Sequence, residues 1–160
     1  MKSSQIEIVP YYSTYQIAYK SLNIEWIERY FKVEAADLKV LDYPKENILN
    51  KGGYIAIALL NGNPVGTCAL IKMENTPYDY ELAKMAVSPK AQGLGIGLAL
   101  GQHIIAKAKE LGAKDIFLES NTLLGPAITL YHKLGFKKVD HIDTPYNRCN
   151  IQMALLFKQD

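Results

Sequence analysis

The stretch that decides the fold is Tyr80-Glu81-Leu82-Ala83-Lys84-Met85-Ala86-Val87-Ser88-Pro89-Lys90-Ala91-Gln92-Gly93-Leu94-Gly95-Ile96-Gly97. Its first eight residues predict a strand that ends at Ser88-Pro89-Lys90. Three glycines follow, and a helical pattern runs from Leu98 to Leu111. Glycine lacks a Cβ, so backbone N–H groups of this loop can turn toward one ligand. The first N–H groups of a helix lack internal partners and lie at its positive end, so the stretch predicts a phosphate or pyrophosphate site.

Two common nucleotide-binding motifs do not fit this stretch. The P-loop string G-x-x-x-x-G-K-S/T is absent from the sequence. A dinucleotide fingerprint requires G-x-G-x-x-G directly after a strand, whereas here the spacing is Gly93-x-Gly95-x-Gly97 and residues 88–92 intervene. From the residues alone, a glycine-rich loop that binds no ligand stays open as the alternative.

Hydrophobic patterns extend the organisation outward from this stretch. The turn Asn61-Gly62-Asn63-Pro64 joins two apolar runs into a predicted hairpin. The strand–helix–strand passage from residue 80 to residue 119 implies a parallel pair beside that antiparallel hairpin. We therefore expect an α/β fold, with a mixed central sheet flanked by helices. The other predicted strands are 6–9, 114–119, 136–142 and 150–157, and the other predicted helices are 15–30, 35–42, 44–49 and 126–134.

Length and composition narrow the class of protein. The 160 residues suit one domain, predicted to span 1–160. A net charge of +2 is too small to indicate binding to nucleic acid or to a membrane surface. We find no signal-peptide core and no apolar run of the roughly 20 residues that span a bilayer, so we expect a cytoplasmic protein. The histidines are scattered without metal-ligand spacing, and Cys68 and Cys149 are expected to be buried free thiols, with a disulfide or a catalytic thiol as the alternative.

Two motifs at the expected separation resemble the GCN5-related N-acetyltransferase (GNAT) superfamily. Gln92-Gly93-Leu94-Gly95-Ile96-Gly97 is similar to the family string Q/R-x-x-G-x-G/A. Pro126-Ala127-Ile128-Thr129-Leu130-Tyr131-His132-Lys133-Leu134-Gly135-Phe136 is similar to the family's closing helix, A-x-x-L-Y-x-x-x-G-F. The resemblance is densest from Tyr80 to Val139. It implies a single-domain acyl-CoA N-acyltransferase fold whose parallel strands splay at the cofactor cleft.

The resemblance also implies acetyl-CoA as co-substrate, without a metal. In the family, amides of the glycine motif hold the CoA pyrophosphate, and the preceding strand bonds the pantetheine arm. Asn121 is expected to touch the cofactor, although a simple loop or cap role is the alternative. The cofactor-binding residues carried over are Met85, Ala86, Val87, Gln92, Gly93, Leu94, Gly95, Ile96, Gly97 and Asn121.

The resemblance suggests two catalytic residues. Glu81 matches a family glutamate and is the candidate base, with a salt-bridged or solvated glutamate as the alternative. Tyr131 matches the family tyrosine and is the candidate acid toward the CoA sulfur, with a packed aromatic ring as the alternative. Strict alternation along the strand puts Glu81 and Met85 on one face and Lys84 on the other, so Lys84 is expected to be solvated or salt-bridged.

In this family the N-terminal helices and the last hairpin usually form the acceptor pocket. Aromatic rings and fixed cations there suit a small molecule with a carboxylate, such as an amino acid, or a peptide N-terminus. Core packing by the rings and salt bridges by the arginines are the alternative. No acidic stripe suits a polycationic acceptor. The candidate acceptor residues are Trp26, Arg29, Tyr30, Tyr146 and Arg148.

The sequence thus predicts an N-acetyltransferase that moves acetyl from acetyl-CoA to a primary amine of a small molecule, amino acid or peptide, by direct attack in a ternary complex. Two alternatives stay open: an acyl-CoA-binding sensor without turnover, and a protein N-terminal or lysine acetyltransferase. Homodimers are common in the superfamily, and the resemblance leaves both a monomer and a homodimer open.

Overall fold

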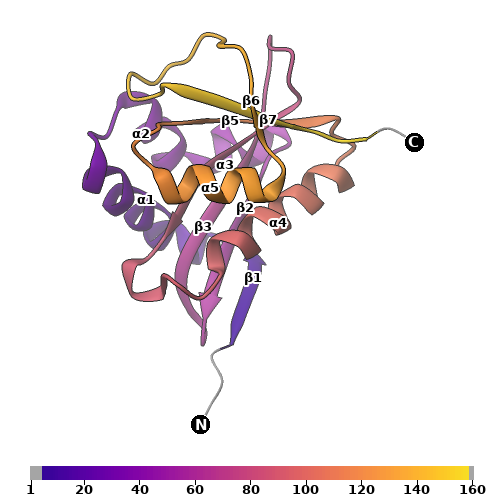
Figure 1. The fold of residues 1–160 in the computed structure, drawn as a ribbon. Helices are drawn as coiled ribbons and strands as arrows, with labels where there is room; N and C mark the ends of the chain where they lie inside the picture. The colour runs from indigo at the N-terminus through magenta and orange to yellow at the C-terminus, as the bar shows by residue number, and fades with distance from the viewer. Residues whose placement is uncertain (1–4, 159–160) are drawn as a thin grey trace.

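A mixed sheet of seven strands forms the centre of the computed structural model, which describes residues 5–158 (Figure 1). The strands lie in the order β1-β2-β3-β4-β5-β7-β6. Neighbours pair antiparallel except β4 and β5, which pair parallel. The predicted α/β mixed sheet is therefore confirmed. The strands are β1 (Ile6–Pro10), β2 (Tyr54–Leu60), β3 (Asn63–Lys72), β4 (Tyr80–Val87), β5 (Asp115–Ser120), β6 (Lys137–Lys138) and β7 (Ile151–Leu156).

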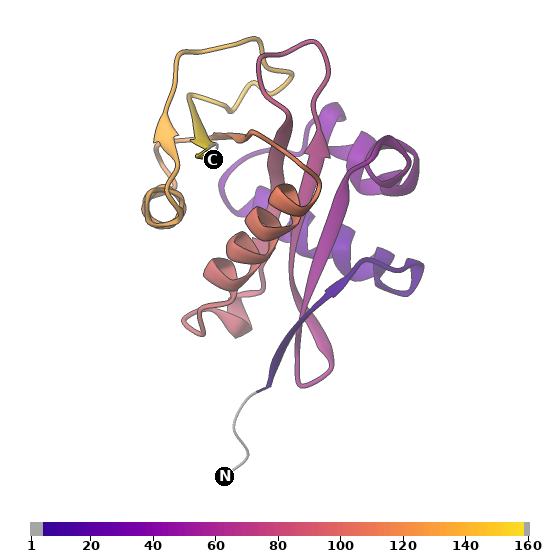
Figure 2. The same cartoon turned by 90° about the vertical axis from the view of Figure 1, so that its right-hand side faces the viewer.

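Helices cover both faces of the sheet (Figure 2). Strand β2 shows why: Ile55 and Ile57 pack against α1 and α2, while Ala56 and Ala58 face α4. Small residues let α4 lie close to the sheet, and a Cβ built on Gly66 of β3 would come within 3.1 Å of Leu100. The helices are α1 (Gln16–Tyr30), α2 (Ala35–Asp42) and α3 (Pro44–Asn47) on one face, and α4 (Ile96–Glu110) and α5 (Gly125–Leu134) on the other; short 3₁₀ turns occupy Ser13–Tyr15, Leu49–Lys51 and Pro89–Ala91.

Helix α2 begins at Ala35, as the sequence predicts, because a capping box fixes its start. The side chain of Glu34 accepts a hydrogen bond from the first turn. In return, Oδ2 of Asp37 accepts one from the backbone N–H of Glu34 at 2.8 Å. The cap places two carboxylates beside the sheet, where they take part in the site described below.

The strand before the last one is much shorter than predicted. Strand β6 covers only Lys137–Lys138, whereas the sequence predicts a strand over 136–142. The reason is the buried side chain of Gln152 on β7. Its amide bonds both backbone groups of Ile142, accepting from the N–H at 2.7 Å and donating to the carbonyl at 2.9 Å. These bonds replace the strand ladder at that point.

Candidate active site

Strands β4 and β5 separate soon after they begin to pair. Their parallel pairing is limited to Tyr80 with Ile116 and Glu81 with Phe117, although both strands continue. The splayed strands predicted from the sequence are therefore confirmed. Two cavities lie along the opening. The first is beside the glycine loop, and the second is between β4, β5 and the segment before β7. Trp26 and Leu124 line both of them.

The glycine loop borders the first cavity, which has about 340 Å³ of free space. Gly93 and Gly95 adopt left-handed conformations, with φ of 81° and 77°, that other residues rarely take. Gly95 is the N-cap of α4, and no side chain caps this helix. The amides of its first turn are thus left for a ligand at the positive end of the helix, which fits the pyrophosphate of CoA. The lining from this region is Val87, Ala91, Gln92, Gly93, Gly95, Ile96 and Gly97; Leu94 is exposed outside it.

A bulge in β4 corrects the predicted direction of Lys84. Thr67 pairs with Ala86 and Ala69 pairs with Ala83, so two residues of β4 lie opposite one residue of β3. Lys84 takes the extra position with a left-handed φ of 51°. The bulge breaks the alternation, and Lys84 lines the second cavity together with Glu81 instead of facing the other side. Lys84 is salt-bridged, as one of the two expectations had it, and is not solvated.

Glu81 lies half-buried on the wall of the second cavity. The pKa of this carboxyl is raised to about 8, mainly by burial and also by the negative charge of Glu119, while the ammonium of Lys84 opposes the rise. Near neutral pH, Glu81 therefore holds a proton that it releases within a small change of pH. This is the range in which a general base is most effective.

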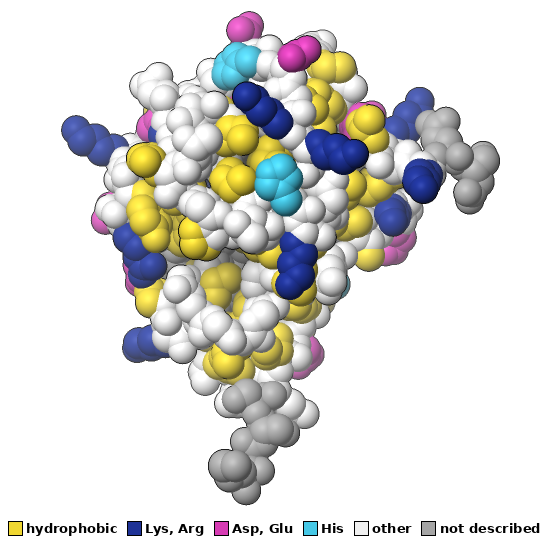
Figure 3. Space-filling model, in the orientation of Figure 1, with side chains coloured by type: hydrophobic (Ala, Val, Ile, Leu, Met, Phe, Trp, Pro, Cys, Tyr) yellow, Lys and Arg dark blue, Asp and Glu magenta, His cyan; other side chains and the backbone are white. Residues whose placement is uncertain are grey.

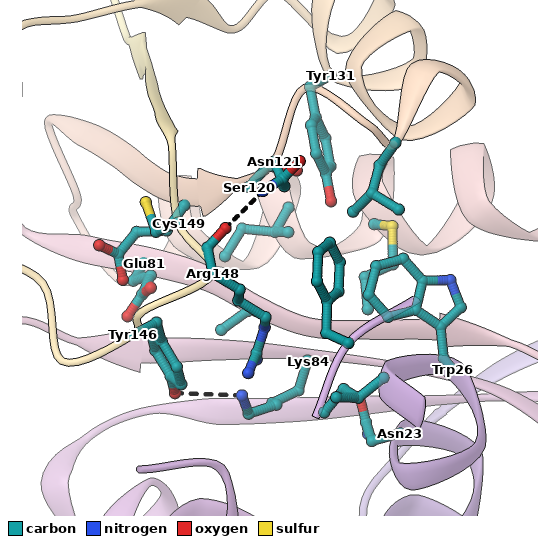
Figure 4. A pocket seen from close by; sticks show the side chains of 17 residues that line it. Asn23, Trp26, Glu81, Lys84, Ser120, Asn121, Tyr131, Tyr146, Arg148 and Cys149 are labelled. Carbon is teal, nitrogen blue, oxygen red and sulfur yellow. Dashed lines mark hydrogen bonds between the residues drawn. The ribbon is translucent and has the colours of Figure 1, made fainter. Parts of the chain in front are cut away.

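Tyr131 reaches the same cavity from α5 (Figure 4). Its ring meets Phe136 edge-on, with 6.2 Å between the centroids, and only 8% of the residue is exposed. Burial raises the pKa of the phenol above its usual value, so the hydroxyl keeps its proton at neutral pH. Figure 4 shows the ring pointing into the cavity, with Glu81 on one side and Trp26 on another. The fold thus brings both predicted catalytic residues to one cavity.

A buried ionic cluster forms the wall opposite α5, and it holds Arg148. The guanidinium donates two hydrogen bonds to Asp37, at 2.7 and 2.6 Å, and one to Glu34 at 3.1 Å. Lys84 donates to Asp37 at 2.6 Å and to the hydroxyl of Tyr146 at 3.2 Å. Burial alone would raise the pKa of Asp37, but the hydrogen bonds from Arg148 and the charge of Lys84 hold it at about 2. Arg148 is therefore a salt-bridged arginine, as the alternative interpretation predicts.

The other predicted acceptor residues lie in different places: some line one of the two cavities, and one lies outside both. Trp26 and Tyr146 line the second cavity, and Tyr30 lines the first. Arg29 is exposed near the end of α1 and lines neither cavity. Asn121 lines the second cavity, but its amide is engaged within the protein: it donates to the carbonyl of Arg148 at 2.7 Å and accepts from the N–H of Leu123 at 2.9 Å.

Sequence reasoning missed two acidic groups at this site. Glu119 is the penultimate residue of β5, and it was missed because it lies far from the glycine motif in the sequence. Its place in the alternation of β5, off the face of the buried Ile116 and Leu118, was an available signal. No sequence pattern pointed to Asp37 on α2, because its partner Arg148 is 111 residues away. Cys149 also lines the cavity; both cysteines are free thiols as expected, but only Cys68 is buried, whereas Cys149 is partly exposed.

On the face that carries α5, lysine and arginine side chains are scattered between apolar ones (Figure 3). Among residues 5–158, no group of three or more His, Cys, Asp or Glu side chains is placed to hold a metal ion. Within the same range, the helices are too short or too polar for a bilayer crossing.

Comparisons with known proteins agree with this geometry. An acetyltransferase (GNAT) family model matches residues 12–136. N-acetyltransferase 8 from Rattus norvegicus is 29% identical over 100 residues, which are 61% of this chain and 45% of that protein. N-acetyltransferase 8 from Mus musculus is 30% identical over 100 residues, which are 61% and 44%. The chain spans about half the length of the curated relatives it matches.

Solved structures share the fold over nearly the whole chain. An acetyltransferase of the GNAT family from Staphylococcus aureus Mu50 is 26% identical with a TM-score of 0.86, covering 96% of this chain and 100% of that one. The Salmonella typhimurium protein yncA, solved with its cofactor acetyl-CoA, is 17% identical with a TM-score of 0.78, covering 98% and 96%, and this likeness shows the fold. Since the family model covers most of the sequence, we conclude that the chain belongs to the acetyltransferase (GNAT) family.

Proposed function

We propose that this chain transfers the acetyl group of acetyl-CoA to a primary amine. The observation that carries the proposal is the shared cavity of Glu81 and Tyr131, which continues past Trp26 and Leu124 to the cavity of the glycine loop. A proton acceptor and a proton donor thus face one space, next to an anion-binding helix end. When bound, acetyl-CoA supplies an acyl group activated as a thioester.

The glycine loop would hold the cofactor by its pyrophosphate. Its amides over 92–97 include those of the uncapped first turn of α4. The pantetheine arm would bond backbone groups of the segment Met85, Ala86 and Val87, on the edge of β4 where pairing with β5 has stopped. Asn121 would support this arm by fixing the loop at the end of β5, in line with its two internal hydrogen bonds.

Glu81 would accept the proton of the amine. A primary alkylamine near pH 7 is mostly protonated, and only its neutral form attacks a thioester. A carboxyl with a pKa of about 8 takes up this proton, directly or through water, more readily than an ordinary glutamate does. An amide of β4, at Met85 or Ala86, would donate to the oxygen on which negative charge develops.

Tyr131 would protonate the departing thiolate. Its phenol keeps its proton at neutral pH and faces the cavity from α5. The amine and the thioester would therefore react directly, with both held at once between β4 and α5. Neither a free thiol nor a metal is needed for this route, and the cysteine at the cavity, Cys149, takes no step in it.

The test combines CoA binding with thiol release. Purified protein should bind acetyl-CoA, and release of free CoA should depend on added amine in a panel of small amines, amino acids and peptides. Binding without amine-dependent release in any member of the panel would favour an acyl-CoA sensor. Release with peptides but not with small amines would favour a protein acetyltransferase.

A further inference from the structure

The cations at the second cavity are already neutralised by acids of the protein itself. Lys84 and Arg148 line the cavity, and both bind Asp37, whose side chain is fully buried. Arg148 also binds Glu34. Because these two cations are held by two carboxylates, neither is available to pair with a carboxylate of an acceptor.

Two other carboxylates of the cavity have no cation of their own. Glu81 and Glu119 both line it, and among residues 5–158 neither has a lysine, arginine or histidine nitrogen within 4.0 Å. Glu119 is held in place by Gln152, whose amide donates to its Oε1 at 3.0 Å. Gln152 is itself buried and bonded to Ile142, so the direction of Glu119 is fixed.

The rest of the wall suits the hydrocarbon part of an amine. The rings of Trp26 and Phe31 line the same cavity as the two acids, whereas the ring of Tyr146 already lies against Lys84 and Arg148. The free space is narrow, about 90 Å³. Aromatic faces stabilise a nearby cation as well as apolar groups, so ring walls and unpaired acids favour the same kind of ligand.

We propose that this cavity binds its acceptor as a cation, a primary amine with no carboxylate beside the amino group, and that Glu119 is the residue that enforces this selection. The inference rests on the proposed function for the identity of the cavity. It replaces the amino-acid acceptor that Arg29 and Arg148 suggest in the sequence.

The physical reason is like-charge repulsion in a half-buried space. An α-carboxylate entering beside Glu119 would lose its water and find no free cation. Placing like charges side by side at a binding surface is strongly unfavourable. We therefore expect discrimination of about tenfold or more against an amine that carries an α-carboxylate.

Three ligands that share a phenol ring test whether a carboxylate beside the amino group weakens binding. Tyramine, tyrosinamide and tyrosine should be titrated by calorimetry into protein saturated with CoA, at low ionic strength. We expect tyramine and tyrosinamide to bind at least about tenfold more tightly than tyrosine. Equal or tighter binding of tyrosine would overturn the inference, and so would equal rejection of tyrosinamide, because that amide adds size without negative charge. Failure of tyramine to bind at millimolar concentration would also overturn it.

A variant of Glu119 then tests whether this residue causes the preference for amines without a carboxylate. Glu119→Gln keeps an oxygen for Gln152 but removes the charge, so the ratio of tyramine to tyrosine affinity should fall toward one. Glu28→Gln, an exposed glutamate of α1 outside the cavity, makes the same charge change and should keep the wild-type ratio. An unchanged ratio in Glu119→Gln would overturn the role of this residue. The wild-type titrations decide the ligand class even where the variant does not fold.

These outcomes differ from a failure of the proposed function. Binding does not depend on turnover, so the ligand preference can hold in a protein that releases no CoA. Conversely, amine-dependent CoA release with tyrosine as the better acceptor would support acetyl transfer and reject the preference for amines without a carboxylate.

Discussion

The ammonium of Lys84 lies 2.6 Å from Oδ1 of Asp37, and neither side chain is more than 6% exposed. This contact joins the bulge of β4 to the first turn of α2. Arg148 binds the same carboxylate from the segment that precedes β7. Three parts of the chain that are far apart in sequence thus meet at one buried charge, which fixes the acceptor side of the cavity.

Replacing Asp37 should therefore destabilise the protein strongly. Asp37→Asn leaves two buried cations with an amide in place of their shared charge, and breaking such a pair typically costs about 3–5 kcal/mol. We expect that loss in the free energy of unfolding measured in urea. The matched control is Asp42→Asn, because Asp42 pairs with Lys20 at 2.6 Å on the surface, where the side chains are 33% and 43% exposed. Such exposed pairs contribute about 1 kcal/mol at most, so similar losses in both variants would contradict the importance of the buried cluster.

Gly95 should be required for its backbone conformation alone. A Cβ at this position would meet nothing within 4 Å, but its φ of 77° is unfavourable for alanine. Gly95→Ala should cost about 1–2 kcal/mol of unfolding free energy and weaken CoA binding by moving the amides at the start of α4. Gly125→Ala is the control, since its Cβ also meets nothing and its φ is not positive. If both variants bound CoA like the wild type, the amides of this loop would not be the anion site.

Glu81 should impose a pH dependence on the reaction. The carboxyl is protonated below its pKa of about 8, so the base form increases as pH rises toward that value. The amine also loses its proton as pH rises, so the measurement is the ratio of kcat/KM between the wild type and Glu81→Gln. We expect this ratio to increase from pH 6, to reach about half of its maximum near pH 8 and to level off above that pH, at about 10²–10⁴. A ratio that stays constant with pH would show that Glu81 does not act as the base.

Local patterns were enough for the elements whose residues pack against nearby partners. Helix α2 has the bounds predicted from the sequence, and β2 and β3 form the hairpin predicted around the turn at residues 61–64. The errors occur where a distant side chain overrides the pattern. The bulge at Lys84 turns this side chain to the face of β4 opposite to the one that alternation predicts. There it pairs with Asp37 on α2, a partner that no local pattern reveals.

The candidate site follows the same rule. Glu81, Tyr131 and the glycine loop belong to motifs that can be recognised in sequence, and the fold brings them to adjoining cavities. The acceptor side depends on pairings that no local pattern encodes. Arg148 bonds a carboxylate 111 residues away, and Gln152 fixes Glu119 across 33 residues. The sequence suggested an arginine that is available to an acceptor, whereas in the structure its guanidinium binds Asp37 and Glu34.

Tyr131 should affect the rate without affecting stability. Its hydroxyl lies in the cavity, and no hydrogen-bond partner for it is found among residues 5–158, so Tyr131→Phe removes a proton donor but no internal contact. We expect kcat to fall by about 10²–10⁴ while the affinity for CoA and the free energy of unfolding stay close to wild type. Tyr19→Phe makes the same chemical change at a buried tyrosine outside the cavity. The hydroxyl of Tyr19 donates to the carbonyl of Val40 at 2.8 Å, so this variant should lose about 1 kcal/mol of stability and keep its kcat. Tyr131→Phe should thus lose activity and keep its stability, whereas Tyr19→Phe should lose stability and keep its activity. A wild-type kcat in Tyr131→Phe would contradict the role of Tyr131 as the acid and leave water to protonate the departing thiolate.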